Sequence, residues 1–270
     1  MLGKIKVYII IVIYNMNCDD SITLNYIDKI SCRDDVDVVI CDNSTNDHTL
    51  NQKYCNTKNY NYINMDGNKG LSKAYNAAIK SIPSDDAWII LFDQDTEISE
   101  DYFAKMVLSI KKFPSVLVHV PIVVDGEGIL SPTKISHYSI KRVKDPHINS
   151  SQLSAINSGM LINLKVFENI GLYEEKLFLE YIDHYFIRKY KEKNGEIIVV
   201  DTKLFQNFSE NDHTNIESDL KRFSIYLSDF KIFCNTSFYG KLFYYAKVLY
   251  RGLKLSLIYK DLSFIKKVLF

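Results

Sequence analysis

The sequence lacks the cysteine spacing of a disulfide scaffold or a zinc site. Its five cysteines are odd in number, include no CxxC pair and fall in segments that have the pattern of ordinary helices and strands. This distribution is typical of reduced thiols in a cytosolic protein. The chain also lacks any apolar run near the ~20 residues of a membrane span. The stretch VYIIIVI near the N-terminus meets YNMNCDD rather than a small-residue cleavage site, so we interpret it as a core strand and not as a signal peptide.

Net charge is absent as well, because 33 Lys and Arg residues balance 33 Asp and Glu residues. The charge is nevertheless uneven along the chain. Residues 241–270 contain seven basic side chains and one acid, a local charge of +6, which leaves −6 on the other 240 residues. A balanced total argues against a general nucleic-acid binder, and the basic C-terminus points to a separate role for that segment.

What the sequence does have is a regular alternation of strand-like and helix-like segments over its first third. The strand-like runs are 6–14, 36–40, 60–64 and 87–92, and the helix-like segments between them are 19–31, 48–57 and 70–82. This alternation predicts right-handed βαβ units and a mainly parallel sheet flanked by helices. The loops that follow the strands are rich in Asn, Asp and Gly, so we expect ligand binding at the carboxyl edge of the sheet.

The pattern changes after residue 112. Longer strand-like runs at 115–124 and 153–163 precede an expected helix at 183–193 and an expected strand at 196–200. No Pro/Gly/Ser-rich linker intervenes, so we expect this second half to extend the same sheet. Residues 215–270 have a helical pattern throughout.

Two aspartates, Asp93 and Asp95, directly follow the apolar run 87–92 in the stretch FDQDTE. Carboxylates at i and i+2 of a turn can direct oxygens at one hard cation, and Mg²⁺ or Mn²⁺ bound in this way takes further ligands from waters and substrate phosphates. A solvated turn or a helix N-cap is the alternative, because acids are common in loops. The position at the carboxyl end of a strand favours a metal–diphosphate site.

The stretch CDNSTND follows the second strand and offers polar groups to a nucleoside. Asp42 and Asn43 can bond a base or a ribose, whereas Ser44 or Thr45 can cap the helix that follows. The two roles are compatible with each other.

The stretch NKGLSKAYNAA begins the next helix-like segment. Asn68, Lys69 and Gly70 lie at its start, where backbone N–H groups attract anions, and Lys73 is near enough to reach the same place. These residues form a further candidate anion-binding group, although a simple turn would also explain Gly70.

In order along the chain, the motifs IVIYN, VVICDNSTND, NKGLSKAYNAAI and LFDQDT resemble those of the family 2 glycosyltransferases. The later stretches INSGMLIN and IGLYEEKLFLEYIDHYF resemble the acceptor-side strand of that family and the segment that carries its catalytic acid. The Asp-Gln-Asp form is close to that of the bacterial rhamnosyltransferase-like enzymes of surface polysaccharide synthesis. The resemblance covers roughly residues 5–230.

The resemblance implies the α/β GT-A fold, which is Rossmann-like, with a mainly parallel mixed sheet flanked by helices, here with a C-terminal helical extension. It divides the chain into a catalytic domain, 1–214, and a helical segment, 215–270. The catalytic domain would have a nucleotide-sugar half to about residue 112 and an acceptor half over 113–214. The implied reaction is an inverting, metal-dependent transfer of a sugar, with rhamnose as one candidate, from a dTDP- or UDP-sugar to a growing surface glycan.

The resemblance also assigns roles to residues. By position, the nucleotide-sugar group is Asp42, Asn43, Asn68, Lys69, Gly70, Lys73 and Asp93, the Mg²⁺ or Mn²⁺ ligands are Asp93 and Asp95, and the general base is Asp183. An inverting transfer needs a carboxylate that takes the proton of the acceptor hydroxyl, and a metal ion neutralises charge on the departing diphosphate. Asp183 opens an expected helix, so N-capping is its alternative role. Glu180 is the rival base, and the family pattern favours Asp183.

One departure from the family concerns a histidine that many relatives carry after the strand that follows the catalytic helix. The matching stretch here is KLFQNFSE, which places Gln206 at that point. His213, in a polar loop further on, is the candidate substitute metal ligand, with a merely solvated side chain as the alternative.

The C-terminal stretch has the pattern of a basic amphipathic helix. Apolar residues recur at three- and four-residue steps and basic residues form another stripe: Leu242, Tyr245, Leu249, Leu253 and Leu257 against Lys247, Arg251 and Lys254. This pattern suits an anionic membrane surface. A helix packed on the domain with an exposed basic face is the alternative. Lipid-linked acceptors are common in the family, so the resemblance favours a peripheral position at the cytoplasmic face of a bacterial membrane.

Two other classes of function remain open. A nucleotidyltransferase also uses a parallel α/β sheet and paired acids, but we would expect a glycine-rich basic loop after its first strand, where this chain has YNMNCDD. A non-catalytic glycan-binding scaffold is the other class, and the absence of the family histidine keeps it open.

Overall fold

The computed structural model describes residues 5–30, 36–46, 49–83, 86–206, 215–235 and 237–269. Nine of the described strands form one sheet. Along its main path the order is β3-β2-β1-β4-β11-β6-β12-β5, and β7 pairs with β6. Three further strands form a small sheet in the order β10-β8-β9.

The first half of the sheet is parallel. Its strands are β1 (Val7–Ile13), β2 (Val36–Asp42), β3 (Asn61–Asn64) and β4 (Trp88–Asp93), and the helices between them are α1 (Ile22–Ile30), α2 (Thr49–Lys58) and α3 (Leu71–Ser81). β1 pairs in parallel with both β2 and β4, and all seven of its residues are buried. The alternation read from the sequence is therefore confirmed, and the apolar N-terminal run is the central strand of this half.

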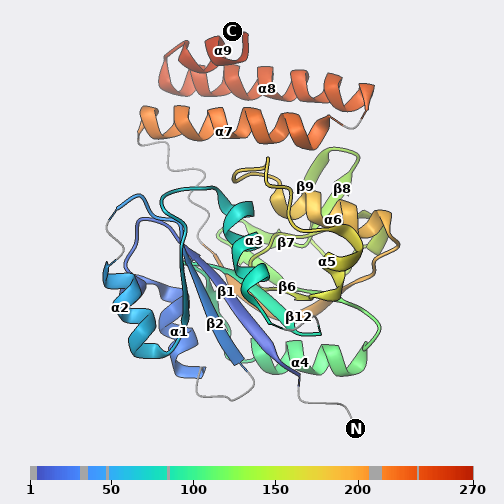
Figure 1. The fold of residues 1–270 in the computed structure, drawn as a ribbon. Helices are drawn as coiled ribbons and strands as arrows, with labels where there is room; N and C mark the ends of the chain where they lie inside the picture. The colour runs from blue at the N-terminus through green and yellow to red at the C-terminus, as the bar shows by residue number, and fades with distance from the viewer. Residues whose placement is uncertain are drawn as a thin grey trace.

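The second half extends the same sheet with mixed strand directions. Its strands are β5 (Glu97–Ile98), β6 (Val118–Asp125), β7 (Gly128–Ser131), β11 (Met160–Asn163) and β12 (Ile197–Phe205), and its helices are α4 (Tyr102–Lys112), α5 (Lys165–Ile170) and α6 (Ile182–Glu192). β11 lies antiparallel between β4 and β6, and β12 runs parallel to β6. The prediction of a mainly parallel mixed sheet flanked by helices is thus confirmed (Figure 1).

The run 153–163, expected to be one strand, is two. β10 (Leu153–Ser154) belongs to the small sheet with β8 (Thr133–Ser136) and β9 (Ser139–Arg142), whereas β11 belongs to the main sheet. The chain changes sheets between them at Gly159, which has a φ of +73° and donates its N–H to the Leu91 carbonyl. Glycine adopts that conformation without the strain that a Cβ would cause.

The period of two along β1 explains how the sheet is covered on both faces. Its even-numbered residues join a core with α3, α5 and α6, whereas its odd-numbered residues join a core with α1 and α4. Both faces are apolar, so the parallel strands read as continuous hydrophobic runs. The polar side chains that follow those strands are left at the carboxyl edge.

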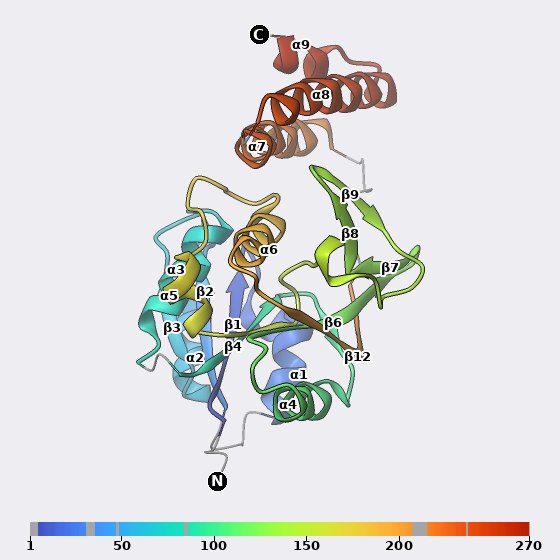
Figure 2. The same cartoon turned by 90° about the vertical axis from the view of Figure 1, so that its right-hand side faces the viewer.

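Three helices lie beyond that edge: α7 (Ile216–Cys234), α8 (Phe238–Tyr259) and α9 (Ser263–Leu269) (Figures 1 and 2). They share a core that includes Phe223, Phe230, Val248 and Phe264. The helical prediction for 215–270 is confirmed for the described residues, with a break after α7 and another at Lys260, which ends α8 in the left-handed conformation. No helix in the described part of the chain is both long enough and apolar enough to span a membrane.

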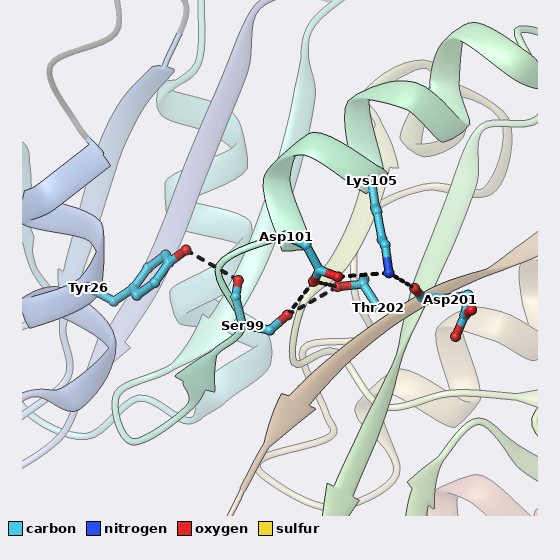
Figure 3. A network of polar contacts seen from close by, with 6 residues as sticks. All are labelled: Tyr26, Ser99, Asp101, Lys105, Asp201 and Thr202. Carbon is cyan, nitrogen blue, oxygen red and sulfur yellow. Dashed lines mark hydrogen bonds and ion pairs between the residues drawn. The ribbon is translucent and has the colours of Figure 1, made fainter.

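A polar network fixes the side of the sheet at which the last strand, β5, pairs with β12 (Figure 3). We call this side the far edge. Asp101 accepts hydrogen bonds from the hydroxyls of Ser99 and Thr202 at 2.8 and 2.7 Å and pairs with Lys105 at 2.7 Å. The Lys105 ammonium also donates to the Asp201 carbonyl at 2.6 Å. The bonds from Lys105, Thr202 and Ser99 lower the pKa of Asp101 to about 2. This network ties the start of α4 to the strand that ends at the candidate site.

Candidate active site

A cavity of about 1110 Å³ lies where the loops at the carboxyl edge of the sheet face α6, α7 and α8. Its volume is slightly above the range of about 300 to 1,000 Å³ that is usual for small-molecule sites. It brings together six of the residues singled out in the sequence: Asn43, Asn68, Gly70, Asp93, Asp95 and Asp183. Gln206 and Glu180 line it as well. We call this space the main cavity.

The Asp-Gln-Asp turn is held from the start of α1. The Thr23 hydroxyl lies 2.6 Å from the Asp93 carbonyl and accepts the N–H of Thr96 at 2.9 Å. The Ser21 hydroxyl donates to the Gln94 carbonyl at 2.6 Å, and the Gln94 side chain accepts the N–H of Tyr14 at 2.8 Å. The turn and the loop after β1 therefore support each other, and the two carboxylates project from a fixed backbone.

Asp93 is partly buried, and two other carboxylates, Asp95 and Asp183, lie near it. Burial is the main cause that raises its pKa to about 6, and the charges of Asp95 and Asp183 act in the same direction. A hydrogen bond from the Gln206 amide at 2.7 Å acts in the opposite direction. The site thus concentrates negative charge that a cation would relieve.

The oxygens here fit a hard divalent cation. Asp93 and Asp95 offer carboxylates, and the side-chain oxygen of Gln206 is buried with no hydrogen-bond partner among the described residues. Carboxylate and amide oxygens are ligands that Mg²⁺ and Mn²⁺ accept. No group of three or more His, Cys, Asp or Glu side chains in metal-binding geometry occurs in the described part of the chain. His213, the predicted substitute ligand, lies outside the described residues.

Asp42 lies beneath the main cavity rather than in its lining, and its side chain is completely buried. It accepts hydrogen bonds from the Ser44 N–H at 3.1 Å, the Asn51 amide at 2.7 Å and the Tyr62 hydroxyl at 3.1 Å. Burial alone would raise its pKa, but the bonds from these three residues outweigh burial and lower it. In this conformation Asp42 organises the loop after β2.

Asn43 links that loop to the start of α3. Its amide donates to the Asn68 side chain at 3.1 Å, and its oxygen accepts the N–H of Lys69 at 2.8 Å. Asn68 also accepts the N–H of Gly70 at 3.0 Å. The side chains of Lys69 and Lys73 are exposed and do not line the main cavity. The two asparagines, not the two lysines, are therefore the members of this group that face the ligand space.

Gly70 is also where the two halves of the site meet. It has a φ of +88°, and a Cβ placed on it would lie 2.7 Å from the Phe178 ring and 2.9 Å from the Phe178 carbonyl. The same carbonyl accepts the N–H of Leu71 at 2.7 Å. A glycine is needed here for conformation and for the close backbone contact, which goes beyond the turn role considered for it.

Asp183 lies in the first turn of α6 with 18% of its side chain exposed. The N-cap is Tyr181, which has a φ of 63° and makes no side-chain capping bond, so Asp183 is not the N-cap. Its carboxylate accepts the N–H of the adjacent His184 at 2.6 Å. Glu180, the rival base, pairs with Arg222 of α7 at 3.3 Å. Of the two carboxylates, Asp183 is the one without an ion pair to a lysine or arginine among the described residues.

The sequence did not identify the residue that holds this segment in place. Asp229 of α7 is 1% exposed and accepts the backbone N–H groups of Phe178, Leu179 and Glu180 at 3.0, 2.8 and 2.8 Å. A signal was present, because Asp229 interrupts an apolar helical stripe that contains Tyr226 and Phe233. Arg222 of α7 and Arg251 of α8 also line the main cavity. The sequence had suggested a separate role for the basic C-terminal segment that contains Arg251.

Comparison with known proteins agrees with the fold. The model of glycosyl transferase family 2 matches residues 8–171, which is more than half of the chain. The dTDP-rhamnosyl transferase RfbF of Shigella flexneri is 28% identical over 191 residues, which cover 66% of this chain and 60% of that protein. The chain thus spans less than two thirds of the length of this relative.

Several solved structures share the fold at low identity. The mannosyltransferase PcManGT from Pyrobaculum calidifontis, in complex with GDP-Man and Mn²⁺, has a TM-score of 0.61 at 12% identity. The match covers 99% of this chain and 86% of the PcManGT chain. S. aureus TarS 1-349 in complex with UDP-GlcNAc has a TM-score of 0.54 at 18% identity, over 84% of this chain and 67% of its own. GalNAc-T7 with UDP, GalNAc and Mn²⁺ has a TM-score of 0.59 at 14% identity, over 77% and 45%. These neighbours share the GT-A architecture, and the match of the family model shows that this chain belongs to glycosyl transferase family 2.

Proposed function

We propose that this protein is an inverting, metal-dependent glycosyltransferase that uses a dTDP- or UDP-sugar donor. The observation that carries the proposal is that one cavity holds the Asp93–Asp95 pair from the end of β4 and Asp183 from the start of α6. Rhamnose is the candidate sugar because RfbF, a relative at 28% identity, is a dTDP-rhamnosyl transferase.

The donor would lie along the loops that follow β2 and β4. Asn43 and Asn68, which line the main cavity and bond to each other, would face the nucleoside, and Asp42, which accepts a bond from Asn51, fixes the loop below them. Asp93, Asp95 and the Gln206 oxygen would hold Mg²⁺ or Mn²⁺. When bound, the ion neutralises charge on the nucleoside diphosphate as it leaves. The solved neighbours PcManGT and GalNAc-T7, which contain Mn²⁺, support a divalent ion.

Asp183 would act on the acceptor. As the acceptor oxygen attacks the anomeric carbon, the bond from that carbon to the diphosphate oxygen breaks, and the hydroxyl proton passes to the Asp183 carboxylate. The nucleoside diphosphate leaves from the opposite face, which inverts the anomeric configuration. Glu180 is less suited to this role because Arg222 already pairs with it.

The acceptor side supports a lipid-linked glycan and contact with an anionic membrane surface. All five apolar residues singled out on α8 are exposed, from Leu249 at 42% to Leu257 at 79%. An exposed apolar stripe on an amphipathic helix is typical of membrane-surface binding. We therefore propose a peripheral position on the cytoplasmic face of a bacterial membrane.

The test is release of nucleoside diphosphate from a panel of dTDP-, UDP- and GDP-sugars, with Mn²⁺, with Mg²⁺ and with EDTA. We expect slow hydrolysis of one donor that requires metal and that is lost in Asp95→Ala. Donor binding without hydrolysis would indicate a missing acceptor. No metal-dependent binding of any donor would contradict the proposal and favour a scaffold.

A further inference from the structure

A second cavity, of about 360 Å³, lies between α7, α8 and the β8–β9 hairpin. Figure 2 shows that hairpin reaching toward the C-terminal helices. The walls of this cavity include aromatic side chains: Tyr138 from the hairpin and Tyr226 and Phe230 from α7. Three cations of α8 enter it, Lys247, Arg251 and Lys254. We call this space the basic cavity.

The described lining of the basic cavity has three basic side chains and no acidic one. Lys247 contacts the Phe243 ring at 5.6 Å, and neither Lys247 nor Lys254 has an ion pair with any described residue. Val248 and Leu255 of this helix are buried in the core shared with α7, whereas Lys247 and Lys254 are exposed. This agrees with the alternative considered from the sequence, a packed helix with an exposed basic face, and that basic face borders the basic cavity.

One of the three cations, Arg251, is held in place by an aromatic ring of the cavity wall. The Arg251 guanidinium lies 4.2 Å from the Tyr226 ring centroid, which restricts its orientation. Arginine binds phosphate oxygens through a planar set of donors, and the lysines add two further positive charges. A phosphate or diphosphate matches three cations better than a single carboxylate does.

The basic cavity is joined to the main cavity on its acceptor side. Ile140, Tyr181 and Arg251 line both spaces. Tyr181 is two residues before Asp183, and its ring stacks against those of Phe230 and Phe233, with centroid distances of 4.9 and 4.8 Å. The residues proposed for donor binding, Asn43, Asn68, Asp93 and Asp95, line only the main cavity. An anion in the basic cavity would thus be anchored next to the proposed base and away from the donor diphosphate.

We propose that the basic cavity binds a phosphate or diphosphate group of the acceptor substrate and thereby presents the acceptor hydroxyl to Asp183. This inference rests on the proposed function. The source of the phosphate is either an amphiphilic, lipid-linked acceptor or a soluble phosphate ester. The exposed apolar residues beside the cavity, Tyr250 at 66% and Leu253 at 48%, favour the amphiphilic source, because its apolar chain can lie along them.

The test measures binding in EDTA, where a metal-dependent donor site does not take part. Farnesyl diphosphate, inorganic pyrophosphate and farnesol are titrated into the wild type by calorimetry, each below its aggregation limit. The same titrations use Lys247→Gln/Lys254→Gln and a control pair that removes equal charge outside the cavity, Lys241→Gln/Lys266→Gln. Mn²⁺-dependent binding of dTDP and UDP is measured in parallel, so that failure of the donor site is recognised separately.

We expect farnesyl diphosphate to bind the wild type and the control pair equally, and to bind the cavity pair about tenfold to a hundredfold more weakly, as loss of two charged contacts implies. Farnesol should not bind. Pyrophosphate as tight as farnesyl diphosphate would support the site with a soluble acceptor, and weaker pyrophosphate would support an amphiphilic one. Absence of binding in EDTA, or equal losses in both pairs, would overturn the proposal. So would lysine-dependent binding only to anionic vesicles, which would indicate membrane adsorption instead.

Discussion

The two walls of the main cavity are built in different ways. The sheet-edge wall consists of the loops after β2 and β4 with the start of α3, and its residues are held mainly by neighbouring loops, as in the bonds from Asn43 to Asn68 and Lys69. The helical wall consists of residues 178–183, and Asp229, about fifty residues further along, holds it. The sheet-edge wall therefore depends on the βαβ framework, and the helical wall depends on how α7 packs.

This difference also separates what the sequence could predict from what it could not. Asp93 and Asp95 directly follow an apolar strand, and the edge at which parallel strands end is fixed by their direction. Their grouping with Asn43 and Asn68 followed from that rule. Asp229 and Arg251 belong to helices whose partners are set by tertiary packing. The spacing around Arg251 was consistent with a membrane role and with a packed surface helix, and no role was predicted for Asp229.

The largest effect should come from changing the chemistry of the helical wall. We expect Asp183→Asn to lower the rate of sugar transfer by about 10²- to 10⁴-fold, because it removes the base and little volume. Initial rates with the identified donor measure this. Glu180→Gln is the matched control and should lower the rate of sugar transfer less. A larger loss of rate in Glu180→Gln would indicate that Glu180, not Asp183, is the base.

The support of the helical wall should matter next. Asp229→Ala leaves three backbone N–H groups without their acceptor, so we expect the free energy of unfolding to fall by about 3 kcal/mol or more. Asp229→Asn retains one acceptor oxygen and should lose less. Urea denaturation measures both variants. A loss below about 1 kcal/mol in Asp229→Ala would show that α7 does not hold this segment.

The junction of the two walls can be tested with two glycines that both have a positive φ but differ in the room available for an added Cβ. Gly67 has a φ of +95° and nothing within 4 Å of an added Cβ, whereas an added Cβ on Gly70 meets Phe178. We expect Gly67→Ala to cost about 1 kcal/mol of unfolding free energy from backbone strain, and Gly70→Ala to cost about 2 to 4 kcal/mol because overpacking is added. Equal costs in thermal or urea unfolding would mean that Phe178 moves freely.

The smallest effect should come from the network at the far edge of the sheet. The pKa of Asp101 is lowered to about 2, so its charged form contributes stability that is present above its ordinary pKa near 3.8 and is lost as pH falls toward 2. The difference in unfolding free energy between wild type and Asp101→Asn should therefore be constant above pH 5 and smaller at pH 3. A difference that grows on acidification would have the wrong sign for this network.

The most direct test of a donor-binding sheet-edge wall and a catalytic helical wall is calorimetric titration of the donor nucleotide with Mn²⁺ into three proteins. These are the wild type, Asp95→Ala and Asp183→Asn. We expect Asp95→Ala to lose metal-dependent binding and Asp183→Asn to keep it within about twofold, because Asp183 is proposed to meet the acceptor rather than the diphosphate. Equal loss of binding in both variants would contradict the division between the walls and place Asp183 in the donor site.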